Sequence, residues 1–74
     1  MVEVTRVFIH SYDREDVEKT ISMIKKKFNV LKVYESSVVP NYVFVEVEGL
    51  LKNDVEEVLR ELGLEDFKVF EVNA

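Results

Sequence analysis

The sequence contains no cysteine, tryptophan or glutamine, and only one proline, two glycines and one histidine among its 74 residues. The absence of cysteine excludes disulfides and the commonest zinc sites, two devices that often stabilise small folds. A domain of this size buries only roughly 60% of the surface that its unfolded chain exposes. Association with a partner, or with another copy of the chain, is the remaining way to add stability.

Long apolar runs are also missing. No stretch approaches the roughly 20 residues that cross a bilayer, and the first residues lack the form of a signal peptide. We therefore expect a cytoplasmic protein without membrane contact, folded as a single domain over residues 1–74. Fifteen acidic residues against ten basic ones give a net charge of −5, which opposes binding to a phosphate backbone. We expect no direct nucleic-acid partner. The abundance of glutamate and lysine favours a heat-adapted source.

Apolar periodicity predicts four strands and two helices. Residues 2–10, 30–35, 42–48 and 67–72 are rich in β-branched and aromatic side chains, as strands are. Helical spacing relates two further groups. The first group is Val17, Ile21, Ile24 and Phe28, and the second is Val55, Val58, Leu59 and Leu62.

Residues at the predicted helix ends have the chemistry of caps. Asp13 is suited to cap the first helix, and Asn29 to end it in the left-handed conformation. Asn53, with a glutamate three residues later, has the form of a capping box for the second helix. Gly63 fits the left-handed end of that helix, with Leu64 expected to touch Leu59.

The order of elements predicts the fold. Residues 36–41 are too few for a crossover helix, so the second and third strands form an antiparallel hairpin. Two right-handed crossovers in the order strand, helix, strand, strand, helix, strand give a four-stranded antiparallel sheet with both helices on one face. We therefore predict an α+β, ferredoxin-like βαββαβ fold.

No pattern of catalytic, cofactor-binding or metal-ligating residues is present. His10 has no nucleophile or positioned partner in the sequence, so we interpret it as a partly solvated histidine at a strand end. Glu46 and Glu48 lie on one strand face and could share a cation, but alternating glutamates are usual on an exposed strand. Three lysines at 25–27 complement the dipole at a helix end. We expect neither an enzyme nor a cofactor.

Three aromatic residues form the candidate binding site. Phe8, Tyr42 and Phe44 are placed on the sheet face opposite Val43, because side chains alternate along a strand. The arrangement is similar to the RNA-recognition motif, but the basic and glycine residues of that motif are missing. A protein partner fits better. Alternatively, residues 36–40 or another copy of the chain cover this face.

Several segments resemble the N-terminal domain of the NusG and archaeal elongation-factor family, the NGN domain. Phe8 to Tyr12 lead into an acidic helix start at Glu15 and Asp16, and Asn41 to Glu46 resemble the family's third strand. Residues 54–62 resemble its acidic second helix. The sequence departs from the family where Asp13 and Arg14 replace a glycine in the first turn. No KOW domain follows, so we expect an isolated domain or a stand-alone relative.

The resemblance implies a non-enzymatic module that docks onto the clamp helices of RNA polymerase, or onto a transcription factor, through an apolar depression. By position, Phe8, Tyr42 and Phe44 would form that depression. In archaea the family also pairs with a small zinc-binding partner along a sheet edge. The alternative hypothesis is a homo-oligomeric structural or small-ligand-sensing ferredoxin-like module, in which the aromatic face or an edge strand makes a homodimer.

Overall fold

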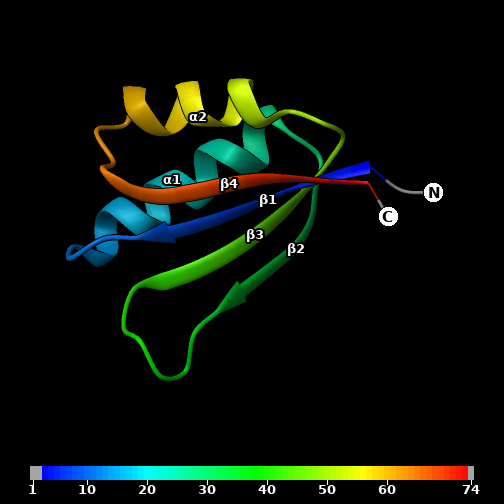
Figure 1. Ribbon diagram of the computed structural model, residues 1–74. Coiled ribbons are helices and arrows are strands. Elements are labelled where there is room, and N and C mark those ends of the chain that lie inside the picture. The colour runs from blue at the N-terminus through cyan, green and yellow to red at the C-terminus, as the bar shows by residue number, and fades with distance from the viewer. Residues whose placement is uncertain (1–2, 74) are drawn as a thin grey trace.

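The computed structural model describes residues 3–73, and it confirms the predicted order of elements (Figure 1). The elements are β1 (Glu3–His10), α1 (Arg14–Lys27), β2 (Val30–Glu35), β3 (Tyr42–Glu48), α2 (Lys52–Glu61) and β4 (Asp66–Asn73). Val2, the predicted first residue of the first strand, lies outside the described residues.

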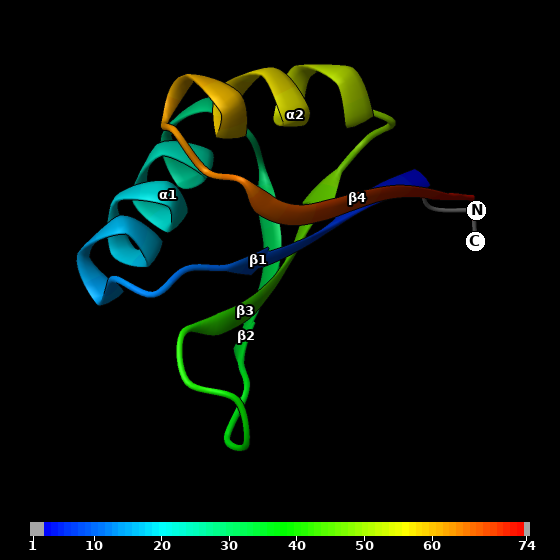
Figure 2. The same ribbon diagram turned by 60° about the vertical axis from the view of Figure 1, so that its left-hand side comes forward.

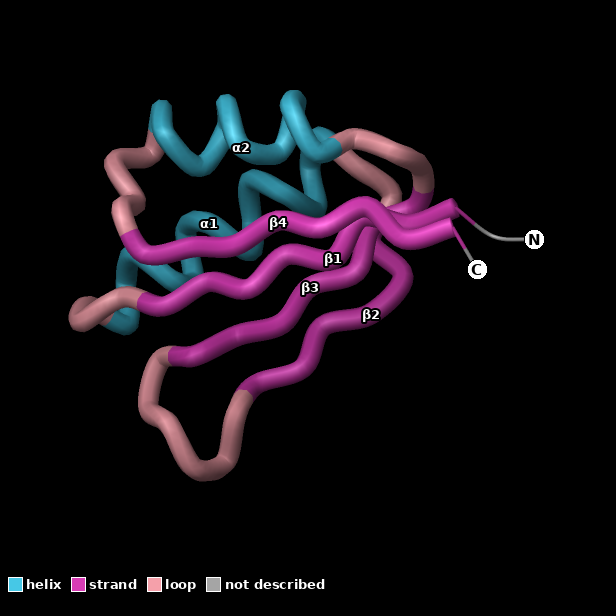
Figure 3. Tube along the Cα trace, viewed as in Figure 1, coloured by secondary structure: helices cyan, strands magenta, loops and turns pink. Residues whose placement is uncertain are grey.

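The four strands form one sheet in the order β2-β3-β1-β4, and each neighbouring pair is antiparallel. Both helices lie on the same side of this sheet (Figure 3). The predicted ferredoxin-like arrangement is therefore confirmed. We call the sheet side that carries the helices the covered face, and the other side the open face.

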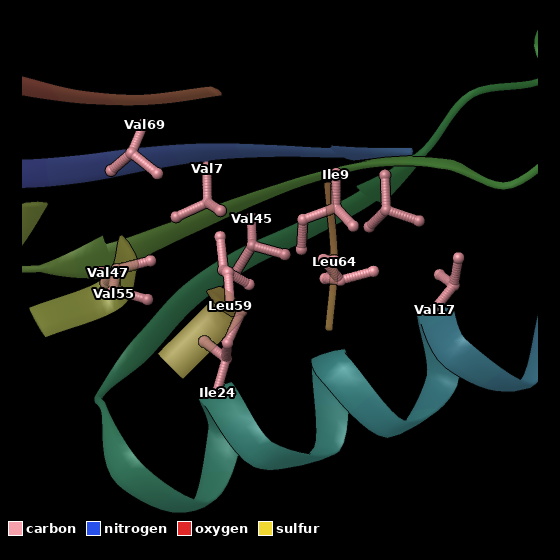
Figure 4. Close-up of a cluster of buried hydrophobic side chains, with 11 residues drawn as sticks. Val7, Ile9, Val17, Ile24, Val45, Val47, Val55, Leu59, Leu64 and Val69 are labelled. Carbon is pink, nitrogen blue, oxygen red and sulfur yellow. The ribbon is translucent and has the colours of Figure 1, made fainter. Parts of the chain in front are cut away.

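The core lies between the covered face and the helices. Alternate residues of the two central strands, such as Val7, Val43 and Val45, are fully buried there. They meet Ile24 of α1 and Leu59 of α2 (Figure 4). One face of each central strand and one stripe of each helix are thus apolar, as a two-layer packing requires.

The start of α1 agrees with the sequence, but its end does not. Asp13 caps the helix, because its carboxylate oxygen Oδ1 accepts the N–H of Glu15 at 2.9 Å. The prediction that Asn29 ends the helix in the left-handed conformation is wrong. Phe28 is the C-cap in an extended conformation and donates its N–H to Ile24 at 2.8 Å. Asn29 instead uses its side-chain amide to bond the carboxylate of Glu48.

The predicted capping box at Asn53 is also wrong. The N-cap of α2 is Leu51, which makes no side-chain cap bond. Thr5, a fully buried residue of β1, fixes this turn instead. Its hydroxyl donates to the carbonyl of Gly49 at 2.7 Å and accepts the N–H of Leu51 at 2.8 Å. A tertiary contact therefore replaces the local cap.

The end of α2 follows the sequence prediction. Gly63 has a φ of 81°, a left-handed conformation that glycine adopts without a Cβ clash. The N–H of Leu64 then bonds the carbonyl of Leu59 at 3.1 Å. Both leucines belong to the buried core, so this turn directs the chain from α2 back into β4.

Candidate binding surface on the open face

The strand register brings the three sequence-predicted residues together on the open face. Phe8 of β1 lies directly opposite Phe44 of β3, and His10 lies opposite Tyr42. Residues directly opposite each other in an antiparallel pair project to the same face. Because Val43 and Val45 face the helices, Phe8, Tyr42 and Phe44 project away from them.

The ring of Phe8 adjoins the rings of both other residues. The ring centroid of Phe8 lies 5.0 Å from that of Phe44 and 6.5 Å from that of Tyr42, both in tilted geometry. These separations are in the range in which aromatic pairs attract. Phe70 of β4 adds a further ring, 5.9 Å from Phe8 and edge-on to it.

Sequence reasoning missed two members of this surface. Tyr34 of β2 lies opposite Phe44, and Phe70 lies opposite Arg6, so both project from the open face. The signal was present in their positions, since each alternates with an inward residue of its strand. We call the five rings the aromatic cluster. Its members are Phe8, Tyr34, Tyr42, Phe44 and Phe70.

The aromatic cluster is accessible to solvent. Tyr34 is 57% exposed, Phe70 50% and Tyr42 37%, whereas Phe8 and Phe44 are half-buried. The connection between β2 and β3 projects beyond the end of the sheet (Figure 2). It therefore does not cover the rings, which was one of the two alternatives for this face.

A depression of about 310 Å³ opens between the rings at the β2 side of the cluster. Its lining consists of Phe8, Tyr34, Ser36, Tyr42 and Phe44. None of these side chains is charged, and the hydroxyl of Ser36 is already engaged as the acceptor for the N–H groups of Val38 and Val39. An apolar, uncharged group therefore suits this depression best.

Charged residues surround the aromatic cluster in matched numbers. Arg6 donates from Nε to Glu46 at 3.3 Å, and Nδ1 of His10 lies 3.1 Å from a carboxylate oxygen of Asp66. Register assigns six ionised side chains to the open face. These are Arg6, Lys32, Lys68, Glu46, Glu48 and Asp66. The open face thus has no net charge, although the whole chain carries −5.

The other candidate residues have structural partners. His10 lies beside Asp66 and 5.5 Å from the ring of Tyr12. Glu46 pairs with Arg6, and Glu48 accepts from Asn29. Within residues 3–73 no group of three or more histidine, cysteine, aspartate or glutamate side chains could hold a metal ion. The last turn of α1 carries the three lysines, as predicted from the helix dipole.

Comparison with known proteins supports the fold. No protein-family model matches the sequence, and no curated protein matches it. Among solved structures, a prephenate dehydratase from Staphylococcus aureus subsp. aureus Mu50 is similar, with a TM-score of 0.55 and 20% sequence identity. The match covers 96% of this chain and 29% of that chain. At this identity the similarity extends to the ferredoxin-like fold alone.

Among the described residues, no helix has both the length and the apolar character needed to span a membrane.

Proposed function

We propose that this chain is a non-enzymatic module of the homo-oligomeric, small-ligand-sensing ferredoxin-like kind, and that the aromatic cluster is its ligand-binding surface. The observation that carries the proposal is the gathering of five rings on the sheet face that no helix covers. A contiguous exposed apolar patch that is rimmed by polar residues is typical of a binding site. The similarity to 29% of a prephenate dehydratase chain supports the proposal in one respect: the same fold occurs there as one part of a longer protein.

The chemistry of the depression limits the class of ligand. The four rings of the lining can stack on a planar group, and two of them, those of Tyr34 and Tyr42, carry phenol hydroxyls. Charged side chains are absent from the lining, so a charged group would lose hydration without gaining an ion pair. The proposed ligand is therefore planar, apolar over most of its surface and uncharged where it enters the depression.

Indole is a suitable probe for this surface. We expect its addition to shift the backbone amide NMR signals of Phe8, Tyr34 and Phe44. The double variant Tyr42→Ala and Phe44→Ala should lose these shifts, since removing an anchor side chain costs at least about 2 kcal/mol, roughly thirtyfold in Kd. Tyr12→Ala, which removes an exposed ring outside the depression, is the control. Shifts that persist unchanged in the double variant would contradict the proposal.

A second candidate function is docking onto RNA polymerase or a transcription factor, in the manner that the NGN resemblance implies. The observation that favours it is the position of Phe8, Tyr42 and Phe44, which adjoin one another beside a polar rim. Aromatic anchors with a polar rim suit the apolar stripe of a partner helix.

Recovery of RNA polymerase from a source extract tests the second candidate. We expect the wild-type chain and Tyr12→Ala to retain polymerase, and the Tyr42→Ala, Phe44→Ala variant to lose it. Equal recovery by all three proteins, or recovery by none, counts against polymerase docking and leaves the ligand-sensing proposal as the better one.

A further inference from the structure

Strand β2 is an edge strand of the sheet, and its side chains are largely exposed to solvent. Every residue from Leu31 to Glu35 is exposed. The β2–β3 hairpin also projects from the body of the molecule (Figures 1 and 2). Within residues 3–73, six of the ten exposed large hydrophobic side chains belong to residues 31–42. They are Leu31, Val33, Tyr34, Val38, Val39 and Tyr42.

The outer part of the same hairpin, residues 30–45, has no net charge, and the charges of Glu46 and Glu48 lie at the inner end of β3. Between residues 30 and 45 only Lys32 and Glu35 are ionised, and their charges cancel, whereas the whole chain carries −5. Glu35 is moreover paired with Arg14 of α1 at 2.6 Å, a hydrogen bond that raises the pKa of Arg14. Two copies of an acidic chain repel each other. Strand β2, with one positive and one negative side chain, is a place where they can meet without net repulsion.

The backbone of β2 is ready to pair. The N–H of Ser36 bonds the carbonyl of Tyr42 at 2.9 Å, in continuation of the register that places Tyr34 opposite Phe44. Bonding alternates along an antiparallel pair. The N–H and C=O groups of Tyr34 therefore face β3, and those of Val33 and Glu35 face outward. Unpaired groups of this kind are a template for another strand.

The other edge of the sheet is protected. Strand β4 carries three ionised side chains, Asp66, Lys68 and Glu71, and helix α2 packs against it. Charges along an edge and a covering helix are devices that prevent strand addition. Strand β2 has a bulge between Val30 and Lys32 and two charged residues, Lys32 and Glu35. Glu35 is already paired with Arg14, and within residues 3–73 no helix packs against this strand closely enough to cover its outer edge in the way that α2 packs against β4.

We propose that two copies of this chain associate through β2, antiparallel and about a two-fold axis at Val33, and so join their four-stranded sheets into one. This inference rests on the homo-oligomeric part of the proposed function. Val33 then lies opposite Val33 of the partner copy, on the covered face. On the open face Lys32 lies opposite Tyr34 of the partner copy, where an ammonium group can contact the ring. No like charges are directly opposed in this register, whereas a two-fold axis at Lys32 would oppose two lysines.

The pairing also enlarges the binding surface. Tyr34 belongs to the edge strand and lines the depression, so the two depressions lie on either side of the new strand pair and on the same side of the joined sheet. A ligand at one depression would then be near the contact between copies. Binding of a ligand in the depression could therefore change how strongly the two copies of the chain associate.

Sedimentation of matched lysine variants tests the contact. We expect the wild-type chain, of 8.7 kDa, to sediment as a dimer, and Val33→Lys to sediment as a monomer because it opposes two charges across the axis. Leu62→Lys is the control, because Leu62 at the end of α2 is as exposed as Val33, both at 37%. A monomeric wild type at millimolar concentration, or a dimeric Val33→Lys, would overturn the inference.

Single cysteine variants test the register, and they remain informative if a lysine variant fails to fold. The natural chain has no cysteine, so every crosslink reports the introduced residue. Opposite residues in a hydrogen-bonded antiparallel pair have Cα atoms about 5.5 Å apart, within the range of roughly 4.4–6.8 Å that a disulfide spans. We expect Val33→Cys to form a covalent dimer on mild oxidation and Phe70→Cys to remain monomeric on a denaturing gel. The reverse result would place the contact elsewhere.

The open-face variants separate this inference from the ligand proposal. Tyr42→Ala with Phe44→Ala should lose indole binding and keep the dimer, since neither residue belongs to β2. Loss of the dimer in that variant would instead show that the aromatic face holds the copies together, and would overturn pairing through β2.

Discussion

Both faces of β3 carry apolar side chains, but they differ in what covers them. Val43, Val45 and Val47 are fully buried beneath the helices, whereas Tyr42 is 37% exposed and Phe44 is half-buried on the other side of the same strand. Hydrophobicity alone therefore does not distinguish core from binding surface. The covering helices decide which apolar face contributes to folding and which remains available to a partner.

The largest expected effect is on folding. Ile9 is fully buried on the covered face, so Ile9→Ala should lower the free energy of unfolding by about 2–5 kcal/mol through lost burial and a cavity. Tyr42→Ala on the open face should lower it by about 1 kcal/mol or less. Urea titration followed by circular dichroism measures both. Equal losses would mean that the open-face rings are part of the core.

The second effect concerns the buried hydroxyl of Thr5 on the covered face. Thr5→Val keeps the shape but leaves the carbonyl of Gly49 and the N–H of Leu51 without this partner, so we expect a loss of about 1–3 kcal/mol. Thr20→Val is the matched control. The hydroxyl of Thr20, also buried, donates to a carbonyl of its own helix, that of Asp16, and its removal should cost less than about 1 kcal/mol. A larger loss for Thr20→Val than for Thr5→Val would contradict the assigned role.

The two helices that cover the sheet begin differently: a side chain caps α1, whereas no side chain of the N-cap residue caps α2. Asp13→Ala removes a side-chain cap and should cost about 1 kcal/mol. Asn53→Ala should change stability by no more than about 0.5 kcal/mol, because Asn53 lies inside α2 and the N-cap is Leu51. Thermal unfolding of both variants checks this pair. A loss at Asn53 comparable with that at Asp13 would restore the capping-box interpretation.

The sequence predictions were correct for those features that depend on residues close together in the chain. Alternation and helical spacing identified all six elements, and Asp13 and Gly63 act as caps because each works through its own backbone neighbourhood. The wrong assignments share another cause. Leu51 starts α2 because a threonine 46 residues away holds its N–H, and Asn29 is drawn to Glu48 of β3. Contacts this distant leave no mark in a short window of sequence.

The candidate site was predictable to the same extent. Phe8, Tyr42 and Phe44 come from the two central strands, whose alternation fixed their face before the register was known. Tyr34 and Phe70 come from the edge strands. Alternation with Val33 and Val69 indicates their face as well, but only the structure shows that Tyr34 lies opposite Phe44 and that the ring of Phe70 adjoins that of Phe8. The depression and the bare edge required the structure.

The smallest expected effect is in the ion pair of Arg6 and Glu46 on the open face. Their side chains are 45% and 21% exposed, and exposed pairs of this kind contribute about 0.2–1 kcal/mol. A double-mutant cycle with Arg6→Ala and Glu46→Ala, measured by urea unfolding, should give a coupling in this range that declines as salt is added. A coupling above about 2 kcal/mol that salt leaves unchanged would indicate a pair screened from water. The open face would then be covered in the free protein, for example by another copy of the chain, and the difference between the two faces would disappear in solution.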